Sequence, residues 1–475
     1  MATTIATKAS VHQFIDSLID VPEFRSANWG VLIVDPGRGE TLYARNADKL
    51  FMPASNMKLL TGSAALVQLG ASYRWTTTLL ARGAVREGVL AGDLVVRGNG
   101  DPSASAHMQK GDALAPLRSL GDSLRAHGIT RVHGRLVAAA SPFTDSPLGY
   151  GWSWSDLDDS YSAGVDALFF NEGFTAIVVR GGAKAGDPVR ATTRPAVSFP
   201  ALIVRAKTVA PLTRYSSPAD SAIVRAGIAV GQDSSRTGVL VSGVVAAGDS
   251  EVVEITFRDQ QAAYLSALRE AFASRGISVD DARSDTTARL DSITTQLSPT
   301  LGEVMPFFEK PSQNQIGELL LKTLALVKTG AGRADSGAAV VSRQVMAWGG
   351  EKDGLAMHDG SGLSRHDYLS PRTIIRVLSA MLAHADFRVF YDALPIAGVD
   401  GTIGSRMRST PAAGNVHAKT GTLDKARSLS GYVTTSDGHM LLFSALCNNY
   451  MVPTRRVDRV SDAIAVRLAS MRLEP

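Results

Sequence analysis

The pattern of apolar residues changes twice along the 475 residues of this sequence, and these two changes constrain the fold more than any other feature. Up to residue 71, and again after about residue 286, helical spacing of apolar residues alternates with apolar strand patterns. Residues 72–285 instead contain short Val-, Ala- and Gly-rich runs separated by Gly, Asp and Pro turns, which are typical of β-structure. Since the chain exceeds one ordinary domain, we expect an α/β domain built from residues 1–71 and 286–475. Residues 72–285 are predicted to be an inserted β-rich accessory region, which forms one compact unit or two subdomains.

The end segments contain most of the predicted helices. Pro53 suits a first helical turn and Gly70 a helix end, and the residues between them leave no wide polar face, so we expect a helix that is buried all round. Other patterns predict helices at 11–19, 260–277, 298–310, 314–330, 370–385 and 454–473, two strands within 28–46, and three successive strands at 414–423, 428–435 and 439–448.

Composition excludes several classes of protein. The net charge of +4 is small for this length and no Lys/Arg-rich block concentrates it, so nucleic acid is not an expected partner. No apolar run approaches the ~20 residues of a membrane-spanning helix. The single cysteine, Cys447, lies in an apolar strand pattern, and the nine histidines include no H-E-x-x-H sequence, so we expect neither a metal site nor another cofactor.

A possible nucleophile and its base stand at the start of the buried helix. In PASNMKLLTG, Ser55 and Lys58 have the i,i+3 spacing that puts both side chains on one helical face. A serine hydroxyl needs a base, and a lysine in apolar surroundings has a lowered pKa, so Lys58 can serve as that base. The alternative is a helix start whose lysine extends to solvent, because a chain of this composition contains about one Ser-x-x-Lys by chance.

Two further motifs follow at long intervals. Ser312 and Asn314 stand in a helix-to-helix turn, where they have either a helix-capping role or a role in proton relay and in holding a substrate carbonyl. On a predicted strand, Lys419 and the hydroxyls of Thr420 and Thr422 suit a carboxylate, and Gly421 allows close approach of a substrate backbone. The alternative for this segment is an ordinary exposed strand.

The three motifs in this order match the set found in penicillin-binding proteins and serine β-lactamases. The sequence resembles the low-molecular-mass class C penicillin-binding proteins, the D-alanyl-D-alanine carboxypeptidase/endopeptidase family. That family also carries a large insertion between its first two motifs, whereas class A β-lactamases place their second motif much nearer the first. The stretches that carry the resemblance are FMPASNMKLLT, RGNGDP, GYGWSWSDLDDSYSAGVDALFFNEG, PSQNQIGELLL, HDGSGLSRHDYLSP, LPIAGVDGTIGSRM and HAKTGTL.

The resemblance implies a penicillin-binding transpeptidase-like α/β/α domain with a large β-rich insertion. It also implies acyl transfer, in which Ser55 attacks the penultimate D-alanine of a peptidoglycan stem peptide and β-lactams acylate the same serine. Catalytic roles then fall to Lys58, Ser312, Asn314 and Lys419. The backbone N–H groups of Ser55 and Thr422 form the oxyanion hole, while Lys419, Thr420 and Thr422 hold the terminal carboxylate and Gly421 lies against the substrate.

Recognition of the diaminopimelate side chain is implied for two further residues, Asp156 and Arg365. The family often has Ser-Asp-Asn as its second motif, and Gln313 replaces the aspartate here, at a position that is not catalytic. Residues 1–20 lack the pattern of a secretory signal, whereas the substrate implies a periplasmic or other extracytoplasmic location.

Two alternatives stay open at this point. A serine β-lactamase or esterase of the same superfamily requires a positioned water and base for deacylation, and no Glu-x-x-Leu-Asn segment supplies them. A non-enzymatic β-lactam-binding or cell-wall-binding module would require a broken catalytic set, whereas all three motifs are intact. The sequence leaves the oligomeric state open, a homo-oligomer included, together with the balance between carboxypeptidase and endopeptidase activity.

Overall fold

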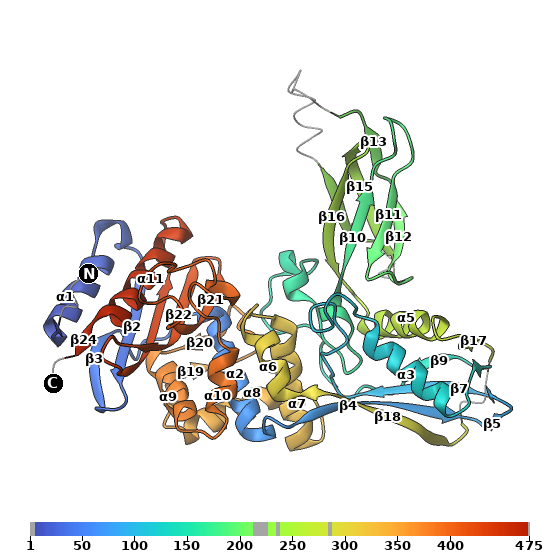
Figure 1. The fold of residues 1–475 in the computed structure, drawn as a ribbon, viewed down its shortest axis with the longest axis horizontal. Coiled ribbons are helices and arrows are strands. Elements are labelled where there is room, and N and C mark those ends of the chain that lie inside the picture. The colour runs from blue at the N-terminus through green and yellow to red at the C-terminus, as the bar shows by residue number, and fades with distance from the viewer. Residues whose placement is uncertain (1–4, 212–226, 234–237, 284–286, 474–475) are drawn as a thin grey trace. The chain divides into compact units, whose positions relative to one another are not determined.

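The computed structural model describes residues 5–211, 227–233, 238–283 and 287–473, which divide into two compact units (Figure 1). Unit 1 comprises Met1–Arg74, Phe143–Trp152 and Pro299–Pro475, and unit 2 comprises Trp75–Pro142 and Ser153–Ser298. Among the described residues, no helix is both long and apolar enough to cross a bilayer.

Unit 1 is organised around one antiparallel sheet in which the two ends of the chain meet. Within the described residues its strand order is β21-β22-β23-β2-β3, so the N-terminal β2 pairs with the C-terminal β23, and β21 lies at an edge. Cys447 is buried in β23, where its burial raises the pKa of the thiol. The strands of unit 1 are β2 (Asn28–Asp35), β3 (Glu40–Arg45), β21 (His417–Leu423), β22 (Ala426–Thr434) and β23 (Met440–Asn448), with the short pairs β1 (Ile5–Ala6) with β24 (Arg472–Leu473) and β19 (Leu355–Ala356) with β20 (Tyr368–Leu369).

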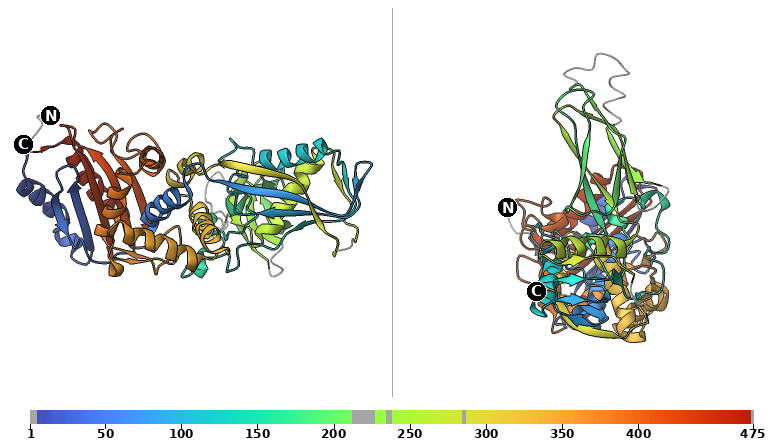
Figure 2. Two further views of the ribbon diagram at one scale, coloured as in Figure 1. Left: turned by 90° about the horizontal axis from the view of Figure 1, so that it is seen from below. Right: turned by 90° about the vertical axis from the view of Figure 1, so that its right-hand side faces the viewer.

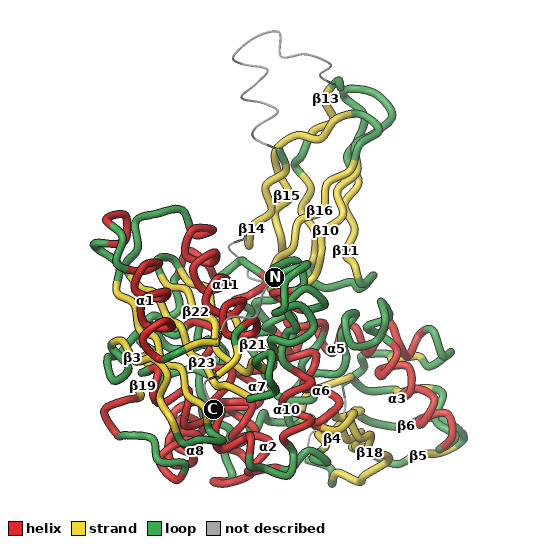
Figure 3. The backbone as a smooth tube through the Cα atoms, turned by 60° about the vertical axis from the view of Figure 1, so that its left-hand side comes forward, coloured by secondary structure: helices red, strands yellow, loops and turns green. Residues whose placement is uncertain are grey.

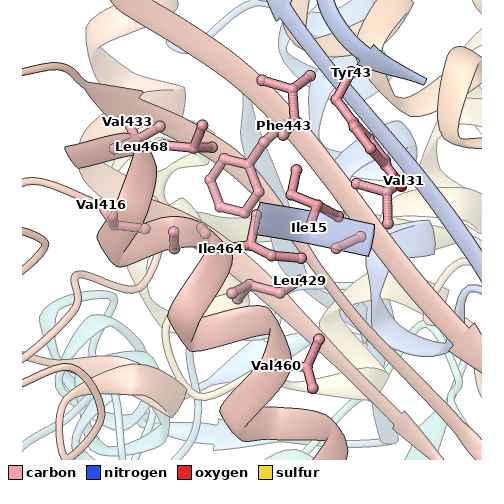
Figure 4. Packing of buried hydrophobic residues seen from close by; sticks show 14 of the residues in the cluster. Ile15, Val31, Tyr43, Val416, Leu429, Val433, Phe443, Val460, Ile464 and Leu468 are labelled. Atoms are coloured by element: carbon pink, nitrogen blue, oxygen red, sulfur yellow. The ribbon is translucent and has the colours of Figure 1, made fainter. Parts of the chain in front are cut away.

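Helices cover both faces of this sheet. On one face, α1 (Lys8–Ile19) and α11 (Thr454–Ser470) place Ile15 and Ile464 against Val31 and Phe443 of the strands, and Figure 4 shows this packing. On the other face, α9 packs against β2 and β23 and in turn contacts α2 (Figure 2). This three-layer arrangement confirms the predicted α/β/α domain. The remaining helices of unit 1 are α2 (Met57–Leu69), α6 (Leu301–Glu309), α7 (Asn314–Thr329), α8 (Ala334–Ala347), α9 (Pro371–Leu382), α10 (Phe387–Ala393), and the 3-10 helices η1 (Pro22–Phe24), η2 (Ala54–Asn56), η6 (Lys352–Gly354) and η7 (Gly401–Ile403).

Unit 2 contains two hydrophobic clusters. The larger one lies between strands and the helices α3 (Ala115–Ala126) and α5 (Gln260–Ala273), and includes Leu79, Leu120 and Phe272. Its strands are β4 (Arg74–Arg82), β5 (Val85–Arg86), β6 (Val89–Leu90), β7 (Asp93–Gly98), β8 (Arg131–Val132), β9 (Leu136–Ala138), β17 (Ser278–Val279) and β18 (Leu290–Thr300). The 3-10 helices of unit 2 are η3 (Trp154–Asp156), η4 (Ser160–Ser162) and η5 (Asn171–Gly173).

The smaller cluster joins Ile177 and Val179 to Val239, Val241 and Ile255. It lies between two sets of paired strands, which Figure 3 shows running side by side. These strands are β10 (Phe174–Arg180), β11 (Arg190–Arg194) and β16 (Ser250–Thr256) in one set, and β12 (Ala201–Val204), β13 (Lys207–Val209), β14 (Ile228–Gln232) and β15 (Gly238–Ala246) in the other.

The sequence-based boundaries at 71/72 and 285/286 differ from this division in two places. Residues 290–300 form strand β18, which pairs with β4, so the β-structure continues past residue 286. Residues 143–152 return to unit 1, where Lys322 of α7 donates a 2.7 Å hydrogen bond to the carbonyl oxygen of Ser146. The sequence reading also missed α3, because Gly121 lies in its interior, although Pro116 suits its first turn.

Candidate active site

The turn before α2 presents Ser55 at the beginning of a buried helix. The 3-10 helix η2 carries Ser55 and runs directly into α2, and Ala54 has a left-handed φ of 48°, a strained value for a residue with a side chain. All residues of α2 from Met57 to Leu66 are buried, as the apolar pattern predicted, and Lys58 is 0% exposed. Ser55 is partly exposed, whereas Lys58 beside it is fully buried.

The amine of Lys58 has three partners. Its Nζ lies 2.9 Å from Oγ of Ser55, 2.6 Å from Oδ1 of Asn314 and 2.7 Å from the carbonyl oxygen of Ser361. The amide oxygen and the carbonyl oxygen can only accept hydrogen bonds, so they take two N–H groups. A neutral amine has two N–H groups and one lone pair, and the lone pair then points at Ser55. The geometry is therefore that of a base beside a nucleophile.

Burial allows the neutral form of the Lys58 amine to be populated near pH 7. It lowers the pKa of Lys58 from 10.5 to about 7, and the charge of Lys419 acts in the same direction. The carboxylates of Glu309, Asp359 and Glu318 act in the opposite direction. At pH 7 roughly half of Lys58 is consequently neutral.

Strand β21 lies directly against the turn that carries Ser55. The side-chain amide of Asn56 donates a 2.9 Å hydrogen bond to the carbonyl oxygen of Lys419, and a Cβ atom added to Gly421 would stand 2.4 Å from the carbonyl oxygen of Pro53 and 3.0 Å from the nitrogen of Ser55. Only glycine allows this approach. Lys419 is itself fully buried, and burial lowers its pKa to about 8.

The two threonines of this strand differ in their contacts. Oγ1 of Thr420 donates a 2.7 Å hydrogen bond to Oγ1 of Thr402, which follows the loop at 394–400. The hydroxyl oxygen of Thr422 instead accepts a hydrogen bond from Arg427. Thr422 is exposed on β21, an edge strand whose start at His417 and Ala418 pairs with residues 395–396, so the end of the strand that carries Thr422 suits a ligand.

The second motif occupies the predicted turn between α6 and α7. Ser312 has a left-handed φ of 64°, and Asn314 begins α7 with its side chain directed at Lys58. The side-chain oxygen of Gln313 accepts hydrogen bonds from the backbone of Gln315, at 2.6 Å, and of Ile316, at 3.3 Å. Gln313 thus caps α7, which gives the residue between Ser312 and Asn314 a structural role.

Sequence reasoning named the loop at 357–367 for Arg365 but missed Ser361, whose carbonyl oxygen is the third partner of Lys58. Glu318 accepts hydrogen bonds from the backbone nitrogens of Gly360, at 3.1 Å, and Ser361, at 2.9 Å. Asp359 accepts from the backbone nitrogen of Gly362, at 2.6 Å, and from Nε1 of Trp152, at 2.8 Å. These buried carboxylates fix the carbonyl group of Ser361 beside Lys58. The available signal was an aspartate within a Gly/Ser-rich loop, HDGSGLSR.

Sequence reasoning also missed Glu309, a buried acid beside the two motif lysines. It ends α6, and within the described part of the chain neither carboxylate oxygen has a hydrogen-bond partner. Its Oε1 faces Gly62, one helical turn after Lys58, where an added Cβ atom would lie 2.8 Å away. Burial raises the pKa of Glu309 to about 7, while the charges of Lys419 and Lys58 lower it. The site therefore gathers two amines and one carboxyl group away from water, and burial shifts the pKa of each toward its neutral form.

Asp156 and Arg365 belong to different units. Asp156 ends η3 in unit 2, next to Trp154, which is 85% exposed. Arg365 is an exposed residue of the loop at 357–367 in unit 1. The structure thus brings together Ser55, Lys58 and Asn314 by direct contact, with the strand of Lys419 adjoining. Joint substrate binding by Asp156 and Arg365 stays a prediction.

Comparison with known proteins gives consistent matches over nearly the whole chain. Residues 11–471 match the D-Ala-D-Ala carboxypeptidase 3 (S13) family. A D-alanyl-D-alanine carboxypeptidase of Actinomadura sp. (strain R39) is 31% identical over 98% of this chain and 85% of its own length. The D-alanyl-D-alanine carboxypeptidase DacB of Haemophilus influenzae is 26% identical over 89% of this chain and 86% of its own length.

The solved structures agree in fold. The crystal structure of penicillin binding protein 4 (dacB) from Haemophilus influenzae superimposes with a TM-score of 0.77 at 24% identity and covers 98% of both chains. The same protein complexed with a novel β-lactam gives a TM-score of 0.72 at 22% identity over 95% of this chain and 99% of that chain.

Proposed function

The chain belongs to the D-Ala-D-Ala carboxypeptidase 3 (S13) family, and from this premise we propose how its own residues perform serine-type D-Ala-D-Ala carboxypeptidase chemistry. Ser55 is the nucleophile and Lys58 is its general base. The observation that carries this assignment is the environment of Lys58. Two oxygen acceptors take the N–H groups of the neutral amine, and Nζ lies 2.9 Å from Oγ of Ser55, to which the lone pair is left.

Acylation begins when Lys58 takes the hydroxyl proton of Ser55. Oγ then bonds to the carbonyl carbon of the penultimate D-alanine, and the backbone N–H groups of Ser55 and Thr422 stabilise the oxyanion. Collapse of this intermediate breaks the bond to the terminal D-alanine. The proton on Lys58 passes through the hydroxyl group of Ser312 to the leaving amine.

Deacylation reverses these roles with water as the nucleophile. Lys58 takes a proton from the water as its oxygen attacks the ester carbonyl, and the released Ser55 oxygen regains a proton from Lys58. Asn314 keeps the amine oriented in both steps and also faces the substrate carbonyl. A β-lactam enters the same path, but its leaving group stays attached to the acyl chain, so the acyl-enzyme persists.

The substrate is proposed to be a peptidoglycan stem peptide. Lys419, Thr420 and Thr422 hold its terminal carboxylate, and the edge of β21 pairs with its backbone. Asp156 and Arg365 are proposed to bind the ammonium and carboxylate of a diaminopimelate side chain. Because this substrate lies outside the cytoplasm, we propose an extracytoplasmic location.

The test compares two reactions of the purified protein. Release of D-alanine from a peptide ending in D-Ala-D-Ala is measured beside hydrolysis of benzylpenicillin. We expect release of D-alanine and slow penicillin turnover, and loss of both in Ser55→Ala. Rapid penicillin turnover without D-alanine release would identify a β-lactamase instead, and penicillin binding without either reaction would identify a binding module.

A further inference from the structure

Arg427 is a cation in direct contact with the proposed carboxylate site. It lies opposite Thr422 in the register of β21 and β22, and its Nη1 donates to Oγ1 of that threonine. Its Nη2 donates a 2.8 Å hydrogen bond to the carboxylate of Asp458 on α11. The Arg427 side chain is only 18% exposed, so packing and the two contacts hold its position.

The direction of the hydrogen bond to Thr422 is fixed by chemistry. A guanidinium can only donate, so the hydroxyl oxygen of Thr422 must accept. The hydroxyl proton of Thr422 is therefore directed away from Arg427 and is free to donate to a ligand. Because Thr422 is exposed on an edge strand, a ligand beside the strand can accept this proton.

The positive charge of Arg427 is only partly neutralised by its acidic partner, Asp458. Asp458 is shared by Arg427 and Arg406, whose Nη1 lies 3.7 Å from it, although Arg406 also pairs with Asp462 at 2.7 Å. Within the described residues, Nε of Arg427 is buried without a hydrogen-bond partner. A carboxylate beside Thr422 would meet a guanidinium in a partly buried setting, where charge-assisted hydrogen bonds are strongest.

We propose that Arg427 is a positioning residue for the terminal carboxylate of the substrate, acting through the hydroxyl group of Thr422. It orients and polarises that hydroxyl group and supplies the charge behind it. This inference rests on the proposed function. It adds a selectivity determinant outside the three motifs, one that favours peptides with a free terminal carboxylate over peptides that lack it.

The experiment uses two peptides that differ only at their C-terminus, one ending in D-Ala-D-Ala and the other in D-Ala-D-alaninamide. For Arg427→Gln we expect kcat/KM to fall by about ten- to a hundredfold on the carboxylate peptide and by less than about threefold on the amide. Equal losses on both peptides would show that Arg427 only supports the fold, and would overturn the inference.

Arg406→Gln is the matched control. It removes the other arginine that pairs with Asp458 and does not contact Thr422, so the ratio of the two kcat/KM values should stay at the wild-type level.

A second measurement tests whether Arg427 acts through the hydroxyl group of Thr422. If Arg427 acts through the hydroxyl group, the double variant Arg427→Gln/Thr422→Val should lose little more than Thr422→Val alone on the carboxylate peptide. Fully multiplicative losses would contradict it.

Two outcomes separate the inference from its premise. If wild-type protein released D-alanine or its amide from neither peptide, the proposed function itself would be wrong. If the wild type is active and prefers the carboxylate, but Arg427→Gln keeps that preference, only the inference fails. Should Arg427→Gln fold poorly, Arg427→Lys keeps the positive charge without the planar guanidinium donors. We expect this variant to retain part of the preference for the carboxylate peptide.

Discussion

The pH dependence of acylation depends on the charges that surround Lys58. With its pKa near 7 rather than 10.5, the neutral base is about 10³-fold more abundant at pH 7 than for an ordinary lysine. The acylation rate should therefore rise tenfold per pH unit below about pH 7 and level off above it. The titration belongs to the cluster of Lys58, Lys419 and Glu309, since these groups interact.

Replacing Glu309 by Gln should move this transition. Where Glu309 is ionised, its carboxylate raises the pKa of Lys58, so its removal lowers that pKa and shifts the part of the profile near pH 7 to lower pH. Two unit charges beyond ion-pair contact, at an effective dielectric constant of about 20, interact by roughly 1–2 kcal/mol, which corresponds to a shift of about one pH unit. The fully buried position of Glu309 prevents screening by salt from removing the effect.

The assay is stopped-flow acylation by a chromogenic cephalosporin, with brief exposure to each pH between about 5 and 9. Glu303→Gln, near the start of the same helix, is the matched control. Glu303 caps α6 through a 2.7 Å hydrogen bond from the backbone of Thr300, which glutamine can also accept, so its profile should match the wild type. An unchanged pH profile in Glu309→Gln, or a shift to higher pH, would show that the charge of Glu309 does not raise the pKa of Lys58.

Three further predictions concern the proposed base Lys58, strand β21 and the loop at 357–367. Lys58→Ala should slow acylation by at least ~10²-fold without unfolding the protein, as measured by penicillin labelling and circular dichroism. Gly421→Ala should slow acylation by more than about tenfold, because the new methyl group would stand 2.4 Å from the carbonyl oxygen of Pro53, whereas Gly231→Ala, with open space around it, should not. Asp359→Ala removes the acceptor for the backbone N–H groups of Gly362 and Ser364 and for Nε1 of Trp152. It should lower the free energy of unfolding by roughly 2–4 kcal/mol in a urea titration, and a loss below about 0.5 kcal/mol would contradict the anchoring role.

The sequence could predict elements whose signals are local. The buried helix ending at Gly70 follows from its apolar run and the left-handed φ of 83° that glycine permits. The three strands at the C-terminal end follow from short apolar runs bounded by turn residues. The strand β18 (Leu290–Thr300) was not predicted, because its polar sequence LDSITTQLSPT becomes a strand only by pairing with β4, more than 200 residues earlier.

In the candidate site, too, only local contacts could be predicted from the sequence. The contact of Ser55 with Lys58 is local and follows from helical spacing, whereas the contact of Lys58 with Ser361 spans 303 residues. Glu309 and Arg427 carry no sequence motif. Their significance comes from burial beside lysines and from cross-strand register, which only the folded chain defines.

Acylation of Ser55 is the step on which the proposed mechanism depends most directly. The measurement is mass spectrometry of the intact protein and of its proteolytic peptides after incubation with benzylpenicillin. We predict one penicilloyl group per chain, located on the peptide and residue of Ser55, and no adduct in Ser55→Ala, while Ser312→Ala keeps a slower adduct at Ser55. An adduct on any other residue, or labelling that persists in Ser55→Ala, would show that Ser55 is not the nucleophile.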